Sequence, residues 1–240
     1  MTLTDTVLSG RTGRLERIWS AGCENATSFS SVAKFSPGIA FYRADGITTV
    51  HLRGVETRAT TLHCPSGAAY FGGELRLGAY LPAFPPTQLA NLQDAVLPTL
   101  PDGRIVLAGQ EWEMPTPENL DVFVDRLERA GLLVFDPLVE EVLQGSDAPE
   151  RTAQSRFRRA VGLSRRKLRV IARAHDAVRR LRAGAAIEDV VSDLDYYDQP
   201  HLTRTLRALI GYTPAELVRG GQFLELGPAL PYKTARRAHP

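Results

Sequence analysis

The C-terminal third of the chain has the hydrophobic spacing of helices. Apolar side chains recur at spacings of four and three, which predicts one buried helical stripe: Leu202, Leu206 and Leu209. Asp198 is placed to cap this helix, and Pro200 fits its first turn, where no backbone donor is needed. The opposite face carries polar donors: His201, Arg204 and Arg207. A helix that is apolar behind and donor-rich in front suits the major groove of DNA.

A shorter amphipathic helix is predicted just upstream. Its apolar positions are Ile187, Val190, Val191 and Leu194. Asp195 follows, and Asp is one of the few residues that tolerates a left-handed turn conformation. The two helices and their turn therefore have a helix-turn-helix layout.

Residues 149–164 predict an earlier helix of the same kind. Ala153, Phe157 and Ala160 fall on one side of it, while the other side carries Arg151, Ser155 and Arg158, with Gln154 at the margin. Gly162 can end this helix and Ser164 can cap the next. The preceding helix is expected from Pro137 to Gln144, with Asp136 as its cap and a turn at 145–149.

A long helix is predicted between the two units, from Ser164 to Ala183. Its inward positions are Leu168, Ile171, Val178 and Leu181, and its outward positions are Arg165, Arg166, Arg169, Arg173 and Arg180. Twenty helical residues span about 30 Å. Because successive major grooves on one side of a duplex lie ~34 Å apart, such a helix can hold two recognition helices in adjacent grooves.

The N-terminal half is patterned differently. Short β-prone runs alternate with Gly- and Pro-containing turn signals: 39–42, 48–53, 59–63 and 68–77. They predict an antiparallel sheet or barrel-like domain of about four to seven strands. A helix with four inward apolar residues follows and connects to the helical part: Leu120, Phe123, Val124 and Leu127. Trp19, Tyr80 and Trp112 could wall an apolar pocket, although core packing is the favoured interpretation.

The predicted fold class is therefore α+β with two domains. An N-terminal antiparallel β-rich domain (1–112) is followed by a connecting helix (113–135). An all-α domain (136–220) then holds two helix-turn-helix units joined by a long helix, and a flexible tail (221–240) ends the chain.

Charge is distributed very unevenly along the chain. Residues 1–150 hold 11 Lys and Arg against 19 Asp and Glu, a net of −8, whereas residues 151–240 hold 18 against 8, a net of +10. The two halves sum to the net +2 of the whole chain. A basic C-terminal third is the electrostatic footprint of a phosphate-binding domain.

The second predicted unit resembles the AraC/XylS family of bacterial transcription regulators. The family's usual run is matched in order and spacing by Tyr196, Asp198, Gln199, His201, Leu202, Thr203, Arg204, Arg207, Gly211, Thr213 and Pro214. Departures occur at Asp195 in place of the turn glycine, at Pro200 in place of serine and at Leu206 in place of phenylalanine. The resemblance implies a sequence-specific regulator that is not an enzyme and needs neither cofactor nor metal.

The resemblance also implies which residues contact a double-stranded operator. These are Arg151, Thr152, Gln154, Ser155, Arg158, Gln199, Pro200, His201, Arg204 and Arg207. By chemistry, the guanidinium fork of Arg204 suits guanine, and Gln154 and Gln199 suit adenine. Arg158, Arg207 and the arginines of the linking helix are expected on phosphates, where they set register without reading sequence.

The N-terminal half loosely resembles a poorly characterised domain that precedes some actinobacterial AraC-type domains. Residues 54–57 and 72–80 stand where that domain has its turn and its long strand. By family analogy this half senses a small-molecule effector, forms a homodimer, or does both. RNA polymerase is a further expected partner if the protein is an activator.

Two other function classes were weighed. The helical domain could serve protein contacts in a small-molecule-binding protein, and an enzyme would have to use His63 with Cys64 in the sheet. His51 with the same pair could also suggest a metal site, but no carboxylate stands at ligand spacing. Two cysteines are too few for a disulfide framework, and no run approaches a membrane span, so a cytoplasmic protein is expected.

Overall fold

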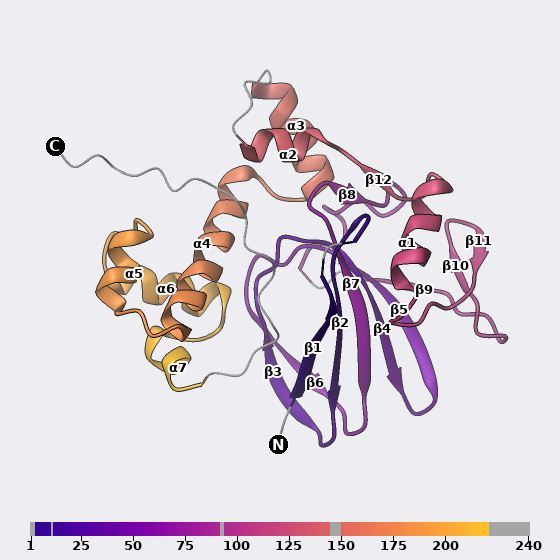
Figure 1. Ribbon diagram of the computed structural model, residues 1–240, viewed down its shortest axis with the longest axis horizontal. Coiled ribbons are helices and arrows are strands. Elements are labelled where there is room, and N and C mark those ends of the chain that lie inside the picture. Colours follow the sequence, from indigo (N-terminus) through magenta and orange to yellow (C-terminus); the bar gives the residue numbers. More distant parts are fainter. Residues whose placement is uncertain (1–2, 11, 92–93, 145–149, 221–240) are drawn as a thin grey trace.

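A computed structural model of the protein describes residues 3–10, 12–91, 94–144 and 150–220. Figure 1 shows a β-rich region, from β1 to β11, followed by a helical region, from α2 to α7. This arrangement confirms the predicted α+β class. The strands form an open antiparallel sheet with smaller pairs beside it, not a closed barrel.

The main sheet has six strands in the order β1-β2-β7-β4-β5-β9, all neighbours antiparallel. Its strands are β1 (Leu3–Ser9), β2 (Leu15–Cys23), β7 (Ala69–Leu75), β4 (Gly38–Ala44), β5 (Ile47–Arg53) and β9 (Ala95–Leu97). The four β-prone runs seen in the sequence correspond to β4, β5, β7 and β6 (Thr60–Cys64). The pattern of β2 was not recognised because a register shift between Leu15 and Arg17 breaks its alternation.

One face of the main sheet is covered by α1 (Leu120–Arg129). Along β5, the buried Val50 and Leu52 alternate with His51 and Arg53, since successive strand residues point to opposite faces. The apolar face packs against the four inward residues predicted for α1: Leu120, Phe123, Val124 and Leu127. The helix therefore shares the core of the β-rich region as well as leading out of it.

The other face of the sheet is covered by the β3–β6 pair, in which β3 (Thr27–Ser31) runs antiparallel to β6. A disulfide joins Cys23 at the end of β2 to Cys64 at the end of β6. The sequence did not indicate this cross-link, because its two cysteines lie 41 residues apart and only the packing of β6 over β2 brings them together.

Two further strand pairs complete the β-rich region and its junction. β10 (Ile105–Leu107) pairs with β11 (Gln110–Trp112). β12 (Val134–Phe135), which follows α1, returns to pair with β8 (Ala79–Tyr80). The segment that leads to the helical region is therefore held to the β-rich region by the β12–β8 pairing.

Among the described residues, the helical region contains one long helix and five shorter ones. They are α2 (Leu138–Gln144), α3 (Glu150–Val161), α4 (Arg165–Arg182), α5 (Ile187–Asp193), α6 (Gln199–Leu209) and α7 (Pro214–Val218). Each predicted helix is present, but the connecting helix is shorter than the expected 113–135, since α1 ends at Arg129 and residues 134–135 form β12. The predicted turn at 145–149 and the tail at 221–240 lie outside the described residues.

The two regions share a hydrophobic core and main-chain hydrogen bonds. Buried side chains of the β-rich region pack with those of the helices: Val32, Ala33, Phe35, Val55 and Leu77. The amides of Ala33 and Ala59 donate to the carbonyls of Leu209 (2.7 Å) and Ala208 (2.9 Å) at the end of α6. The helical region is therefore attached to the β-rich region and not tethered by its linker alone.

Candidate nucleic-acid interface

The start of α6 is fixed by the residues that the sequence singled out. The side chain of Asp198 accepts a hydrogen bond from the amide of His201 at 2.6 Å, and Pro200 stands in the first turn. Behind the helix, the predicted leucine stripe is buried: Leu202, Leu206 and Leu209. The opposite side of α6, including Arg204, is left to solvent.

The turn between α5 and α6 contains a residue with positive φ, Asp195, which a side chain of α4 contacts. Asp195 has a φ of +54°, a left-handed conformation in which the family norm is glycine. Arg173 donates to its carbonyl at 3.2 Å and lies over the ring of Tyr196, 4.5 Å from the centroid. Burial raises the pKa of Tyr196 to about 12, so this phenol stays neutral in the core.

The helix pair α2 and α3 is held by a carboxylate that serves both helices. Asp136 accepts from the amide of Leu138 at 3.1 Å, as a cap of α2. The same carboxylate binds the guanidinium of Arg156 on α3 at 2.6 and 3.1 Å. The apolar side predicted for α3 is buried: Ala153, Phe157 and Ala160.

The long helix α4 connects the two pairs. Ser164 caps it by accepting from the amide of Lys167, as predicted. Its 18 residues correspond to about 27 Å at 1.5 Å per residue. In the chain, α4 therefore connects α3, which precedes its N-terminus, to the α5–α6 pair, which follows its C-terminus.

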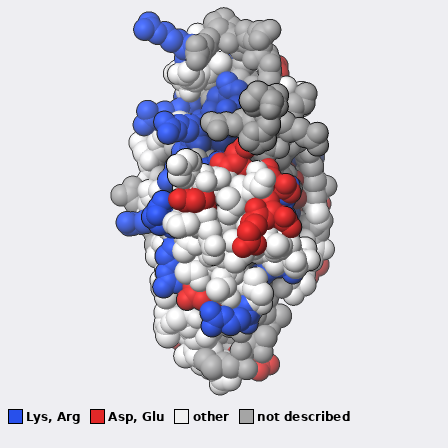
Figure 2. All heavy atoms as spheres, turned by 90° about the vertical axis from the view of Figure 1, so that its left-hand side faces the viewer, with Lys and Arg blue, Asp and Glu red and all other residues white. Residues whose placement is uncertain are grey.

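A basic hollow of about 1140 Å³ lies between α3, α4 and α6; we call it the arginine hollow. Its basic lining residues are Arg158, Arg165, Arg166, Arg169 and Arg173. Gln154 enters it from α3, and His201 and Thr205 enter it from α6. Figure 2, which faces the helical side, shows Lys and Arg gathered in a band along one side of this surface.

The predicted contact residues occupy three kinds of position. Three line the arginine hollow: Gln154, Arg158 and His201. Six are exposed on α3 or α6 outside its lining: Arg151, Thr152, Ser155, Gln199, Pro200 and Arg204. Arg207 lies near the C-terminus of α6 and donates to the carboxylate of Glu216 at 2.8 Å.

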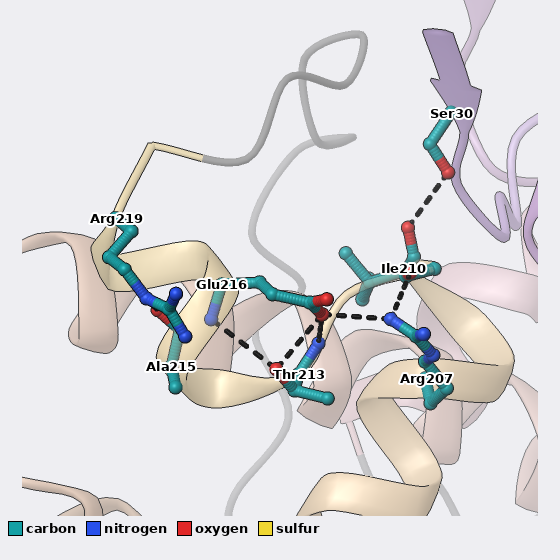
Figure 3. Close-up of polar contacts among 8 residues, drawn as sticks. Ser30, Arg207, Ile210, Thr213, Ala215, Glu216 and Arg219 are labelled. Carbon is teal, nitrogen blue, oxygen red and sulfur yellow. Dashed lines mark hydrogen bonds and ion pairs between the residues drawn. The ribbon is translucent and has the colours of Figure 1, made fainter.

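Arg207 belongs to the network that caps α7 (Figure 3). Thr213 and Glu216 form a capping box, in which each side chain accepts from the other's backbone amide. Interaction with Thr213 and with Arg207 lowers the pKa of Glu216, which keeps this carboxylate ionised. Beside this network, the Ser30 hydroxyl of β3 donates to the carbonyl of Ile210 at 3.0 Å.

Two side chains at this surface were not selected from the sequence. Thr205 lines the arginine hollow one turn beyond His201, and the spacing of four could have indicated it. Tyr197 is 90% exposed at the start of α6, which is unusual for so large an aromatic side chain. Its place in a turn, beside the buried Tyr196, could have signalled an outward orientation.

The other candidate chemistry lies in the β-rich region. Cys64 is in the disulfide, so the alternative that paired His63 with a thiol nucleophile lacks its nucleophile. His63 Nδ1 is instead hydrogen-bonded to Ser28 (3.3 Å), and His51 Nε2 to Thr49 (3.0 Å). Across the described ranges, no three His, Cys, Asp or Glu side chains cluster in a way that could hold a metal ion.

No helix among the described residues is long and apolar enough to cross a membrane. A family model described as "Helix-turn-helix domain" matches residues 146–220. Comparisons with curated proteins and with solved structures gave no match. The family match covers α3 to α7, which together carry the arginine hollow and the capped helix α6. The match supports a helix-turn-helix domain of the AraC type at residues 146–220, and with it DNA binding and transcription regulation.

Proposed function

We propose that the protein is a sequence-specific transcription regulator that places α3 and α6 in successive major grooves of one DNA duplex. The observation that carries this proposal is the arginine hollow, which spans the space between these two helices along α4. The helix α4, which connects the two helix pairs, is about 27 Å long, comparable with the ~34 Å that separates major grooves on one side of the duplex.

The contacts divide into readers of bases and holders of phosphate. Arg204 is proposed to bind guanine from α6, and Gln154 and Gln199 to contact adenine. Polar side chains on the same two helices add base or nearby contacts: Arg151, Thr152, Ser155 and His201. Pro200 offers only apolar contact.

Phosphate binding is assigned to arginines that border the groove-reading helices. Arg158, Arg166 and Arg169 are exposed and face the arginine hollow, where a duplex backbone would pass. Arg207 would have to bind phosphate while paired with Glu216, which weakens its positive field at that position.

The β-rich region is proposed to regulate this DNA binding, by sensing a small-molecule effector, by dimerising, or by both. Its main-chain attachment to the end of α6 supports a regulatory role. Contact with RNA polymerase, in the case of an activator, completes the proposal. A cytoplasmic location is proposed from DNA binding alone, because the Cys23–Cys64 disulfide removes the argument from the cysteine count.

Selection from a randomised duplex pool at two salt concentrations tests the function. We expect an enriched motif of two short blocks about one helical turn apart, with retention that falls steeply as salt rises. Retention without any enriched sequence would instead indicate a non-specific basic protein. A complete lack of retention, with and without candidate effectors, would contradict DNA binding.

A further inference from the structure

A cavity of about 350 Å³ lies in the β-rich region, between the main sheet and the β3–β6 pair. Its lining is Trp19, Ala21, Phe29, Ala40, Tyr42, His51, Arg53, Leu62, His63, Pro65, Tyr70 and Asp94. The volume falls within the range of small-molecule sites, which is roughly 300–1,000 Å³. Of the three side chains that the sequence offers as pocket walls, Trp19 lines this cavity, whereas Tyr80 and Trp112 do not.

Small residues on the floor and aromatic residues on the walls give the cavity its shape. Ala21 and Ala40 leave space that larger side chains would fill. A Cβ atom at Gly72 would lie 2.8 Å from the indole of Trp19, so only glycine lets the indole rest against β7. The rings of Tyr42 and Tyr70 stand 4.9 Å apart on the wall. Flat walls of this kind favour a ring-shaped occupant.

The polar groups of the lining include an ion pair. Arg53 lies 2.7 Å from a carboxylate oxygen of Glu56 and 3.4 Å from one of Asp94. Two carboxylates already balance this guanidinium, so the pair does not favour an anionic ligand. Asp94 keeps lone pairs that can accept a hydrogen bond from a hydroxyl group. The lining therefore suits an uncharged ring compound with a hydrogen-bond donor.

The cavity wall is also the segment that holds α6. Phe29 lines the cavity, and the next residue, Ser30, donates to the carbonyl of Ile210 just after α6. At the other end of the β3–β6 pair, the Cys64 disulfide fastens β6 to the main sheet. A molecule bound in the cavity would therefore displace β3 less at the end held by the disulfide. The displacement would reach α6 at the other end, through the hydrogen bond of Ser30.

We propose that this cavity binds an uncharged, hydroxyl-bearing aromatic small molecule, and that the bound molecule alters DNA affinity through β3 and α6. The coupling rests on the proposed DNA-binding function. The ligand site itself does not, because it lies wholly within the β-rich region.

Calorimetric titration of the full chain with 2-naphthol, without DNA, tests the site. We expect saturable binding with one molecule per chain, and binding at least tenfold weaker for cyclohexanol and for 2-naphthalenesulfonate. The variant A40F fills the cavity floor and is expected to lose at least tenfold in affinity. A69F, on the exposed start of β7, is the matched control and is expected to bind normally.

A second variant keeps the site testable if A40F does not fold. Asp94→Ala removes the acceptor and is expected to weaken 2-naphthol at least fivefold, with little change for cyclohexanol. The absence of saturable 2-naphthol binding, or wild-type affinity in a folded A40F and in D94A, would overturn the proposal.

The coupling is tested on the selected duplex with saturating 2-naphthol. We expect DNA affinity to change at least threefold in the wild type and to be unchanged in A40F. Unchanged affinity in the wild type would overturn the coupling while the site stands. Binding of 2-naphthol by a chain that retains no duplex would instead overturn the proposed function, so the two failures are distinguishable.

Discussion

The two helices proposed to read DNA, α3 and α6, differ in how they are attached to the rest of the molecule. The end of α6 receives main-chain and side-chain donors from the β-rich region, at the carbonyls of Ala208, Leu209 and Ile210. The helix α3 packs beside β8, and its Arg156 binds Asp136, whose amide donates to the carbonyl of Gly78 at 2.9 Å. Events in the β-rich region can therefore reach α6 through direct hydrogen bonds, and α3 through packing and an ion pair.

Acidification is expected to lower the stability of the whole fold, through a group at the junction beside α6. His175 of α4 is fully buried, and its Nε2 donates to the carbonyl of Ala33, whose amide in turn holds Leu209. Burial lowers the pKa of His175 to about 4, so the folded protein keeps it neutral. The unfolded chain takes up its proton first, near pH 6.5, and stability is lost as pH falls from there toward 4.

Between pH 7 and pH 5 we expect this group to reduce the free energy of unfolding by about 2 kcal/mol, at 1.36 kcal/mol per pKa unit. Denaturant titrations at the two pH values measure it. His175→Gln keeps a donor but cannot titrate in this range, so its stability should change much less. An equal pH dependence in wild type and H175Q would contradict the assignment.

The arginines of α4 are expected to contribute to DNA binding in both halves of the operator. The double variant Arg166→Ala with Arg169→Ala should weaken DNA binding by roughly 60-fold at about 0.1 M salt. The reason is that each lost phosphate contact reduces by about 0.9 the slope of the log binding constant against the log salt concentration. Fluorescence anisotropy over a salt series measures both quantities. R43A/R129A, on exposed β4 and α1 positions, is the charge-matched control. Loss confined to one half of the operator would show that the arginine hollow does not serve both helices.

Substitutions of the proposed base-contacting residues should affect different operator blocks, one for each helix. Arg204→Ala on α6 is expected to lose about 1–3 kcal/mol of discrimination at one base position in one block of the operator, and Gln154→Ala on α3 a similar amount in the other block. Competition with operators mutated at single positions measures this. Uniform weakening on all sequences would make Arg204 a phosphate contact.

The smallest effect is expected from the caps. Asp198→Ala should cost about 1 kcal/mol of stability, because the amide of His201 loses its acceptor at the start of α6. Ser164→Ala, at the cap of α4, is the comparison variant and should cost a similar amount. If the two helices read DNA independently, D198A should blur only the motif block that α6 reads. A change in both blocks would show that α4 transmits the loss.

Much of the helical region was predictable because its signals are local. The leucine stripe of α6, the caps at Asp198 and Ser164 and the left-handed turn at Asp195 each depend on residues within about one helical turn. The strands β4 to β7 were recognised for the same reason. The bulged β2 was missed because its irregular register hides the period of two.

The residues of the candidate interface stay a prediction from the sequence, and their grouping in space comes from the fold. Gln154 and His201 were chosen from separate helices, and only the fold shows that they face one hollow. Arg207 followed the same helical pattern as Arg204, yet it is paired with Glu216 because α7 folds back beside it. Helical periodicity cannot report a partner on another element.

The sequence by itself determined the α+β class, the helix-turn-helix pattern and the concentration of positive charge near it, since these follow from periodicity, caps and composition. Only the tertiary structure decided the Cys23–Cys64 disulfide, the attachment of β3 to α6 and the aromatic cavity between the sheets. Each of these joins residues far apart in the chain. Such contacts arise when whole apolar faces pack against one another, and no local pattern encodes which faces will meet.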